Sequence, residues 1–146
     1  MLPDFYDGEN LPEGNHPCTW EDFVVRFAYN DHRRVLLERL SHVMATAKHC
    51  DFLFAVIFGS YITSKEAPGD VDIVWVLSEA VRTEELPNRC KQLLEHDRSK
   101  ERFGCDLWYF TDSEGFLNRI NTLWGFTRDY PKKRGLVIIT LADYEL

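Results

Sequence analysis

Apolar residues recur along the chain with two spacings, one typical of helices and one typical of strands. Over residues 31–49 they recur every three or four positions, which predicts an amphipathic helix capped by Asn30. A shorter helix is expected over 20–28, because Thr19 and Asp22 have the spacing of a capping box. The charged residues of the longer helix are expected to form a solvated face: Arg33, Arg34, Glu38, Arg39 and Lys48.

Segments rich in β-branched and aromatic residues predict four strands, over residues 51–58, 71–77, 105–110 and 136–141. In the second of these, alternation places Val71, Ile73, Trp75 and Leu77 on one face and Asp72, Val74 and Val76 on the other. Helices are predicted over about 86–98 and after Asp112 or Ser113, the latter containing Phe116, Leu117, Ile120 and Leu123. Helices and strands that alternate in this way indicate an α/β or α+β fold with one mixed central sheet flanked by helices.

The 146 residues are expected to form one domain, 1–146, in which residues 1–18 are an irregular lead-in. No apolar run approaches the roughly 20 residues of a membrane span. The opening residues lack the basic and apolar regions of a signal peptide, so we expect a cytoplasmic protein. Its four cysteines, Cys18, Cys50, Cys90 and Cys105, are widely spaced and are therefore expected to be reduced thiols.

The formal net charge is −7, which argues against a domain that grips nucleic acid through its phosphates. Stable binding of nucleic acid is therefore not expected. The charge is compatible with an enzyme whose divalent cations neutralise part of the acidic surface.

Three acidic residues stand at the beginnings of predicted strands: Asp70 and Asp72 at one strand and Asp106 at the next. Residues two apart on a strand face the same way, so Asp70 and Asp72 are expected to present their carboxylates to one point. Asp106 joins them if its strand lies alongside. Clustered carboxylates repel one another unless a cation lies among them, and hard oxygen ligands favour Mg²⁺ or Mn²⁺.

A Gly-Ser pair ahead of these carboxylates offers a complementary binding element. Gly59 ends a predicted strand and permits a tight turn, after which Ser60 is expected to open a short helix over residues 60–66. A helix amino terminus beside a hydroxyl suits a β- or γ-phosphate. Lys65 lies within reach of such a phosphate, although a solvent-facing position is the commoner one for a lysine.

Taken together, these elements resemble the signature of the DNA polymerase β superfamily of nucleotidyltransferases. The matching residues are Phe58-Gly59-Ser60, then Asp70-Val71-Asp72-Ile73 after nine intervening residues, and then Cys105-Asp106-Leu107. The stretches "LPEGNHPCTWEDF", "GSYITSKEAPGDVDI" and "GLVIITL" also resemble a family of small, largely uncharacterised bacterial and phage nucleotidyltransferase-like proteins. The resemblance implies a nucleotidyltransferase fold.

The resemblance further implies that Asp70, Asp72 and Asp106 hold two divalent ions, Mg²⁺ or Mn²⁺, while Gly59 and Ser60 bind the phosphates of a nucleoside triphosphate. The reaction implied is transfer of a nucleoside monophosphate to a hydroxyl group. Polymerising members of the superfamily carry further domains that hold the acceptor. By analogy with minimal nucleotidyltransferase antitoxins, the leading acceptor is a toxin-like partner protein.

Two alternatives stay open on the sequence. One is a nucleotide- or protein-binding module that has this fold but no turnover. The other is nucleotidylation of RNA or of a small molecule, for which the sequence shows no large second domain to hold the acceptor.

Overall fold

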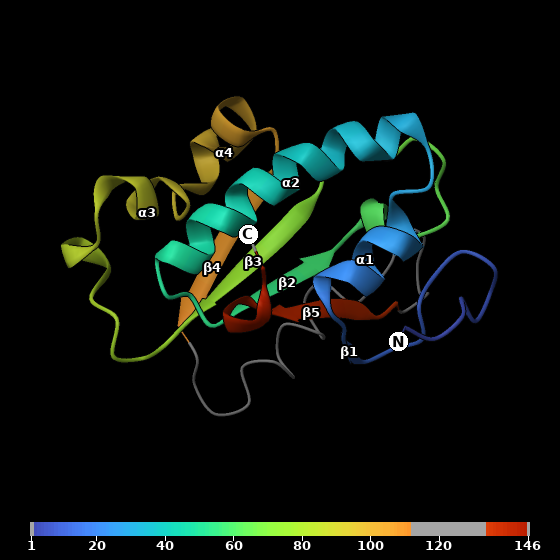
Figure 1. Cartoon of the computed structure of the whole chain (residues 1–146), viewed down its shortest axis with the longest axis horizontal. Coiled ribbons are helices and arrows are strands. Elements are labelled where there is room, and N and C mark those ends of the chain that lie inside the picture. The colour runs from blue at the N-terminus through green and yellow to red at the C-terminus, as the bar shows by residue number, and fades with distance from the viewer. Residues whose placement is uncertain (1, 112–133, 146) are drawn as a thin grey trace.

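The computed structural model describes residues 2–111 and 134–145, and its secondary structure forms a mixed α/β arrangement (Figure 1). The strands are β1 (Asn15–Pro17), β2 (Phe54–Phe58), β3 (Asp72–Leu77), β4 (Asp106–Thr111) and β5 (Leu136–Thr140). The α-helices are α1 (Trp20–Phe27), α2 (Asp31–His49), α3 (Asn88–Gln92) and α4 (His96–Phe103). Single 3₁₀ turns are η1 (Ser60–Ile62), η2 (Thr83–Glu85) and η3 (Leu141–Asp143).

The five strands of the described residues form one mixed sheet in the order β1-β5-β2-β3-β4. Strand β2 is antiparallel to both β3 and β5, whereas β1 runs parallel to β5 and β4 runs parallel to β3. The parallel connection from β3 to β4 contains α3 and α4, as such connections require a crossover. The predicted fold class is therefore confirmed: a mixed central sheet flanked by helices.

Helices α1 and α2 cover one face of the sheet (Figure 1). Side chains of both helices pack on this face against alternate residues of the strands, such as Ile57, Ile73 and Trp75. The opposite face buries a second, smaller group that includes Val56, Phe58 and Val74. The alternation predicted for the second strand is thus confirmed, because its two sets of residues lie in different clusters.

Both predicted helix caps are present. The Thr19 hydroxyl accepts a hydrogen bond from the amide of Asp22 at 3.1 Å, and the Asn30 side chain accepts one from the amide of Arg33 at 2.8 Å. Each cap satisfies an amide that the first helical turn leaves without a partner. The two helices begin where the sequence predicted.

Several predictions need correction. Arg33 does not belong to a solvated helix face, because its side chain is completely buried. The helix expected over 86–98 is divided into α3 and α4, since the chain leaves helical geometry near Glu95. The expected irregular lead-in ends in β1, which gains hydrogen bonds by pairing with β5. The helix predicted after Asp112 or Ser113 lies outside the described residues.

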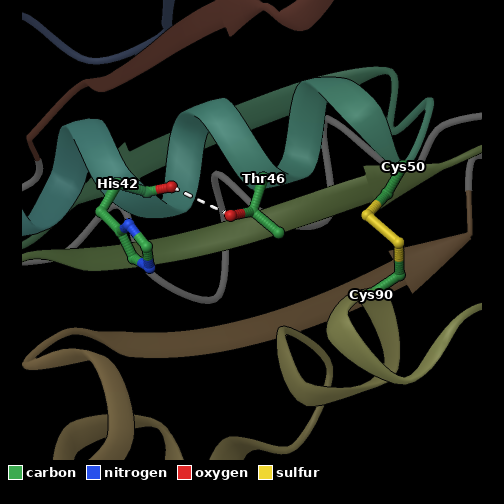
Figure 2. The surroundings of a disulfide bond; sticks show 4 residues. All are labelled: His42, Thr46, Cys50 and Cys90. Carbon is green, nitrogen blue, oxygen red and sulfur yellow. Dashed lines mark hydrogen bonds between the residues drawn. A yellow bond between two sulfur atoms is a disulfide. The ribbon is translucent and has the colours of Figure 1, made fainter.

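The prediction of four reduced cysteines is wrong for two of them. Cys50, which follows α2, and Cys90 of α3 form a disulfide with their Cα atoms 5.9 Å apart (Figure 2). The sequence separates these residues by 40 positions, so only the packing of α3 beside the end of α2 brings them together. Cys18 and Cys105 are free thiols, as predicted.

None of the helices in the described ranges has the length and hydropathy that crossing a bilayer requires.

Candidate functional site

The three predicted acidic residues meet at the beginning of strands β3 and β4. Asp72 and Asp106 are register partners at the first positions of these parallel strands, which are about 4.8 Å apart in such a pair. Asp70 precedes β3 and reaches the same point, since one ammonium group contacts both Asp70 and Asp106. The expected position of Asp106, beside Asp70 and Asp72, is therefore confirmed.

Lys100 of α4 supplies that ammonium group. Its Nζ lies 3.2 Å from Oδ2 of Asp70 and 3.2 Å from Oδ2 of Asp106. These hydrogen bonds and charges raise the pKa of Lys100 above its ordinary value. Lys100 therefore stays protonated and offsets part of the negative charge of the carboxylates.

Asp72 is the carboxylate most affected by its surroundings. Its pKa is raised from 3.8 to about 7, first of all by burial, and then by the charge and hydrogen bonding of Asp106 and the charge of Asp70. Lys100 acts in the opposite direction. A carboxylate that burial and like charge push toward the neutral form is a group that a nearby cation would return to the ionised form.

The Gly59 turn is packed directly against Asp72. Gly59 has φ of 83° and follows Phe58, the register partner of Asp72 across β2 and β3. A Cβ atom at Gly59 would overlap Oδ2 of Asp72 and lie 3.2 Å from its Cγ. Glycine is therefore required here both by the left-handed backbone and by the close approach of the carboxylate.

Ser60 begins the segment that follows this turn. The helix predicted over 60–66 is wrong in length, because only the 3₁₀ turn Ser60–Ile62 forms. The hydroxyl and the amide of Thr63 both donate to the carbonyl of Ser60, at 2.7 and 3.2 Å, and end the turn. Ser60 thus stands one residue from the carboxylate contact, but on a short turn rather than a helix.

Arg33 of α2 holds the continuation of this segment. Its guanidinium donates to the carbonyl oxygens of Tyr61, Thr63 and Lys65, and also to that of Phe27. Burial lowers the pKa of Arg33 below its ordinary value. We call this arrangement the Arg33 clamp: Arg33 and the four carbonyl groups that it binds.

Lys65 is placed differently from the other predicted residues. Its side chain is exposed, and its carbonyl oxygen accepts two hydrogen bonds from Arg33. Within the described ranges, the lysine that forms ion pairs with the carboxylates is Lys100 rather than Lys65.

Lys100 and Arg33 are the residues that sequence reasoning missed. A signal for Lys100 exists in hindsight, because it stands one helical turn before Gly104, whose left-handed conformation ends α4 and leads into Asp106. Arg33 offered no such signal, since its neighbours Arg34 and Asp31 form the exposed pair that a solvated face predicts.

Cys105 lies next to the carboxylates but is no nucleophile near neutral pH. Burial raises the pKa of its thiol to about 12, so the thiolate is scarcely populated. The reactive groups of this site are oxygens.

The donor set suits a hard divalent cation by its chemistry. Carboxylate oxygens are ligands that Mg²⁺ and Mn²⁺ favour, and burial together with the neighbouring carboxylates disfavours the ionised form of Asp72 unless a cation lies beside it. In the part of the chain that the structure describes, no three His, Cys, Asp or Glu side chains already surround one point as metal ligands. Lys100 lies between two of the three carboxylates instead.

Comparison with protein families places this chain in a family of unknown function (DUF6932), whose model matches residues 3–140. Because the match spans nearly the whole chain, the protein belongs to that family. No curated protein and no solved structure matches the chain.

Proposed function

We propose that this protein is a metal-dependent nucleotidyltransferase that moves a nucleoside monophosphate from a nucleoside triphosphate to a hydroxyl acceptor. The supporting observation is the register that sets Asp72 against Asp106, with the Gly59 turn packed on Asp72. Three carboxyl groups and a glycine turn beside them are parts that the chemistry requires, and they lie close together. The resemblance of their sequence motifs to the DNA polymerase β superfamily supports the same activity.

In this proposal Asp70, Asp72 and Asp106 hold Mg²⁺ or Mn²⁺, two ions in all, and Gly59 and Ser60 face the phosphates. The ions would supply charge neutralisation at the reacting phosphorus and at the attacking and leaving oxygens. The chain itself contributes orientation, because the β3–β4 register and the Arg33 clamp fix the carboxylates and the turn on rigid elements.

The proposed step is an in-line displacement. The acceptor hydroxyl oxygen forms a bond to the α-phosphorus, the bond from that phosphorus to the β-phosphate oxygen breaks, and pyrophosphate leaves. Asp106 takes the proton of the hydroxyl, which is the role that the resemblance to the superfamily implies for the third carboxylate.

The acceptor in this proposal is a hydroxyl on a partner protein, in the manner of antitoxins that modify a toxin. The net charge of −7 argues against a nucleic acid held through its phosphates as the acceptor. The Cys50–Cys90 disulfide argues against the cytoplasmic location expected from the sequence, since such bonds are typical of oxidising compartments.

A second candidate function is a binding module without turnover, and one observation favours it. Lys100 forms ion pairs with both Asp70 and Asp106, as it would in a purely structural ion-pair cluster. The two candidates differ in whether nucleotide is consumed.

The experiment is a transfer assay with α-labelled ATP, GTP, CTP and UTP, supplied with Mg²⁺ or Mn²⁺ and with a cell extract as the source of acceptors. We expect label on a protein band with the wild-type chain and a loss of roughly 100-fold or more in Asp72→Asn, because electrostatic groups of this kind contribute several kcal/mol to transfer reactions. Asp70→Asn and Asp106→Asn should lose label as well.

Asp97→Asn is the matched control, since Asp97 is an exposed acid of α4 and the change removes the same charge. It should label as the wild type does. Absence of transfer from all four nucleotides, or equal transfer by wild type and Asp70→Asn, would leave the binding module as the function.

A further inference from the structure

Lys100 stands at the point where a cation is needed, and it is held there by its helix. Ser99 and His96, which precede it on α4, both contact the backbone of Leu107 in β4. The Ser99 hydroxyl accepts a hydrogen bond from the Leu107 amide at 3.0 Å, and His96 Nδ1 lies 3.1 Å from the Leu107 carbonyl oxygen. Ser99 is completely buried. The backbone at Lys100 is therefore fixed relative to Asp106, the residue that directly precedes Leu107.

The ammonium group of Lys100 is much freer to move than the helix backbone that carries it. The Lys100 side chain is 58% exposed, against 36% for Asp70 and 17% for Asp106. Ion pairs that water reaches are weak and exchange readily, since solvent screens the attraction. The ammonium group can therefore leave the carboxylates without unfolding any element.

Charge balance favours such a departure when a divalent ion arrives. Lys100 offsets the charge of one carboxylate, whereas a divalent cation offsets two. Asp72 stands beside Asp106 in the register of β3 and β4, so a third carboxyl group lies near the two that Lys100 contacts. A lysine has three donors but no acceptor, so its ammonium and a metal ion compete for the same carboxylate oxygens.

We infer that Lys100 is the internal counter-ion of the metal-free site and that a divalent metal binds by displacing its ammonium group from Asp70 and Asp106. This inference rests on the proposed function, since it concerns the metal that the nucleotidyltransferase reaction would use. It assigns Lys100 a positioning role: the residue keeps Asp70 and Asp106 together before metal arrives and weakens metal affinity in return.

The inference is tested by Mn²⁺ binding, followed through the electron paramagnetic resonance signal of free Mn²⁺. Lys100→Met should bind Mn²⁺ roughly three- to tenfold more tightly than the wild type, which is the effect of removing two solvent-accessible ion pairs that compete with the ion. Arg98→Met is the matched control, because Arg98 is an exposed cation of the same helix and the change in net charge is identical. It should alter Mn²⁺ affinity by no more than about twofold, as salt screens a charge that is not in contact.

A second measurement follows the lysine itself. Acetylation of wild-type Lys100 by a limiting amount of an acylating reagent, read by mass spectrometry, should rise when Mn²⁺ is added, because the freed amine loses its carboxylate partners. Lys91 of α3 serves as the internal reference and should not respond. A Lys100 that is acetylated equally with and without bound Mn²⁺ overturns the inference.

The possible outcomes distinguish a failure of this inference from a failure of the proposed function. If the wild type binds Mn²⁺ and Asp72→Asn binds it at least about tenfold more weakly, the metal site stands. Equal affinities of Lys100→Met and Arg98→Met would then overturn the role of Lys100 alone. If neither the wild type nor Lys100→Met binds Mn²⁺ at millimolar concentration, both the metal site and the inference fail.

Discussion

Two cations of this molecule, Arg33 and Lys100, illustrate opposite ways of placing a positive charge. Arg33 is completely buried among uncharged groups: its N–H groups donate to the carbonyls of the Arg33 clamp, and its guanidinium lies over the rings of Tyr29 and Tyr61. Lys100 is more than half exposed and contacts two carboxylates. The buried cation has neutral partners, and the exposed cation has charged ones.

The difference teaches which of the two charges is free to change partners. Removing Arg33 from its place would leave buried carbonyl groups without hydrogen bonds, which is costly whatever replaces it. Moving Lys100 exposes its partners to water or to another cation, either of which satisfies them. We therefore regard the Arg33 clamp as a fixed part of the fold and the Lys100 cluster as the part that responds to ligands.

The largest expected effect is the loss of the clamp. Arg33→Met should lower the free energy of unfolding by about 3 to 5 kcal/mol, because it leaves several buried acceptors unpaired. Urea unfolding followed by circular dichroism measures this. Arg34→Met is the control, since Arg34 forms only an exposed pair with Asp31 at 2.8 Å, and it should cost less than about 1 kcal/mol.

Arg33→Lys sharpens the same comparison. A lysine keeps the charge but cannot reach several carbonyl groups with the fork of a guanidinium, so its stability should fall between those of wild type and Arg33→Met. If Arg33→Met lost no more stability than Arg34→Met, the clamp would not be the fixed part of the fold.

The second prediction concerns the pH dependence of the carboxylate cluster in metal-free protein. The pKa of Asp72 rises to about 7 in the folded state from 3.8, so the folded chain holds this proton more tightly than the unfolded chain. Its contribution to stability is complete below about pH 4 and is lost as the pH rises to about 7. Asp72→Asn lacks this loss, so relative to wild type it should gain on the order of 2 kcal/mol between pH 5 and pH 8.

Urea unfolding in the presence of a chelator at several pH values gives this difference. Saturating Mn²⁺ should remove most of it, because a bound cation stabilises ionised Asp72. Parallel pH profiles of the wild type and Asp72→Asn without metal would contradict the burial and repulsion described for this carboxylate. An Asn that is more stable than the native Asp would show that the carboxylate is retained for something other than folding.

Much of this fold was predictable because local rules and tertiary packing agree. The alternation of Ile73 and Trp75 with Val74 and Val76 identified the two faces of β3, and the caps at Thr19 and Asn30 identified where helices begin. The meeting of Asp72 with Asp106 followed from strand order, once β4 was assumed to lie beside β3. These features depend on short segments or on one assumption of adjacency.

The features that escaped prediction all depend on contacts between distant segments. Arg33 has the spacing of a surface residue, and its burial depends largely on the carbonyls of residues 61–65, about 30 positions away in the sequence. The Cys50–Cys90 bond likewise requires α3 to lie against the end of α2. Lys100 was overlooked because a lysine on a short polar helix is ordinarily solvated, and its place one turn before Gly104 does not identify its two carboxylate partners.

The smallest expected change in stability comes from Gly59→Ala, at a residue between the Arg33 clamp and the Lys100 cluster. The added Cβ meets the Asp72 carboxylate and the residue would have to keep φ of 83°, so we expect a loss of about 1 to 3 kcal/mol in the free energy of unfolding. Gly69→Ala is the control, since no described atom lies within 4 Å of a Cβ there and it should be close to neutral.

Because the clash displaces the carboxylate itself, Gly59→Ala should also weaken Mn²⁺ binding. Arg33→Lys, which disturbs only the clamp, should leave Mn²⁺ affinity within about threefold of wild type. Weakened binding in Arg33→Lys and unchanged binding in Gly59→Ala would reverse the assignment of the two regions.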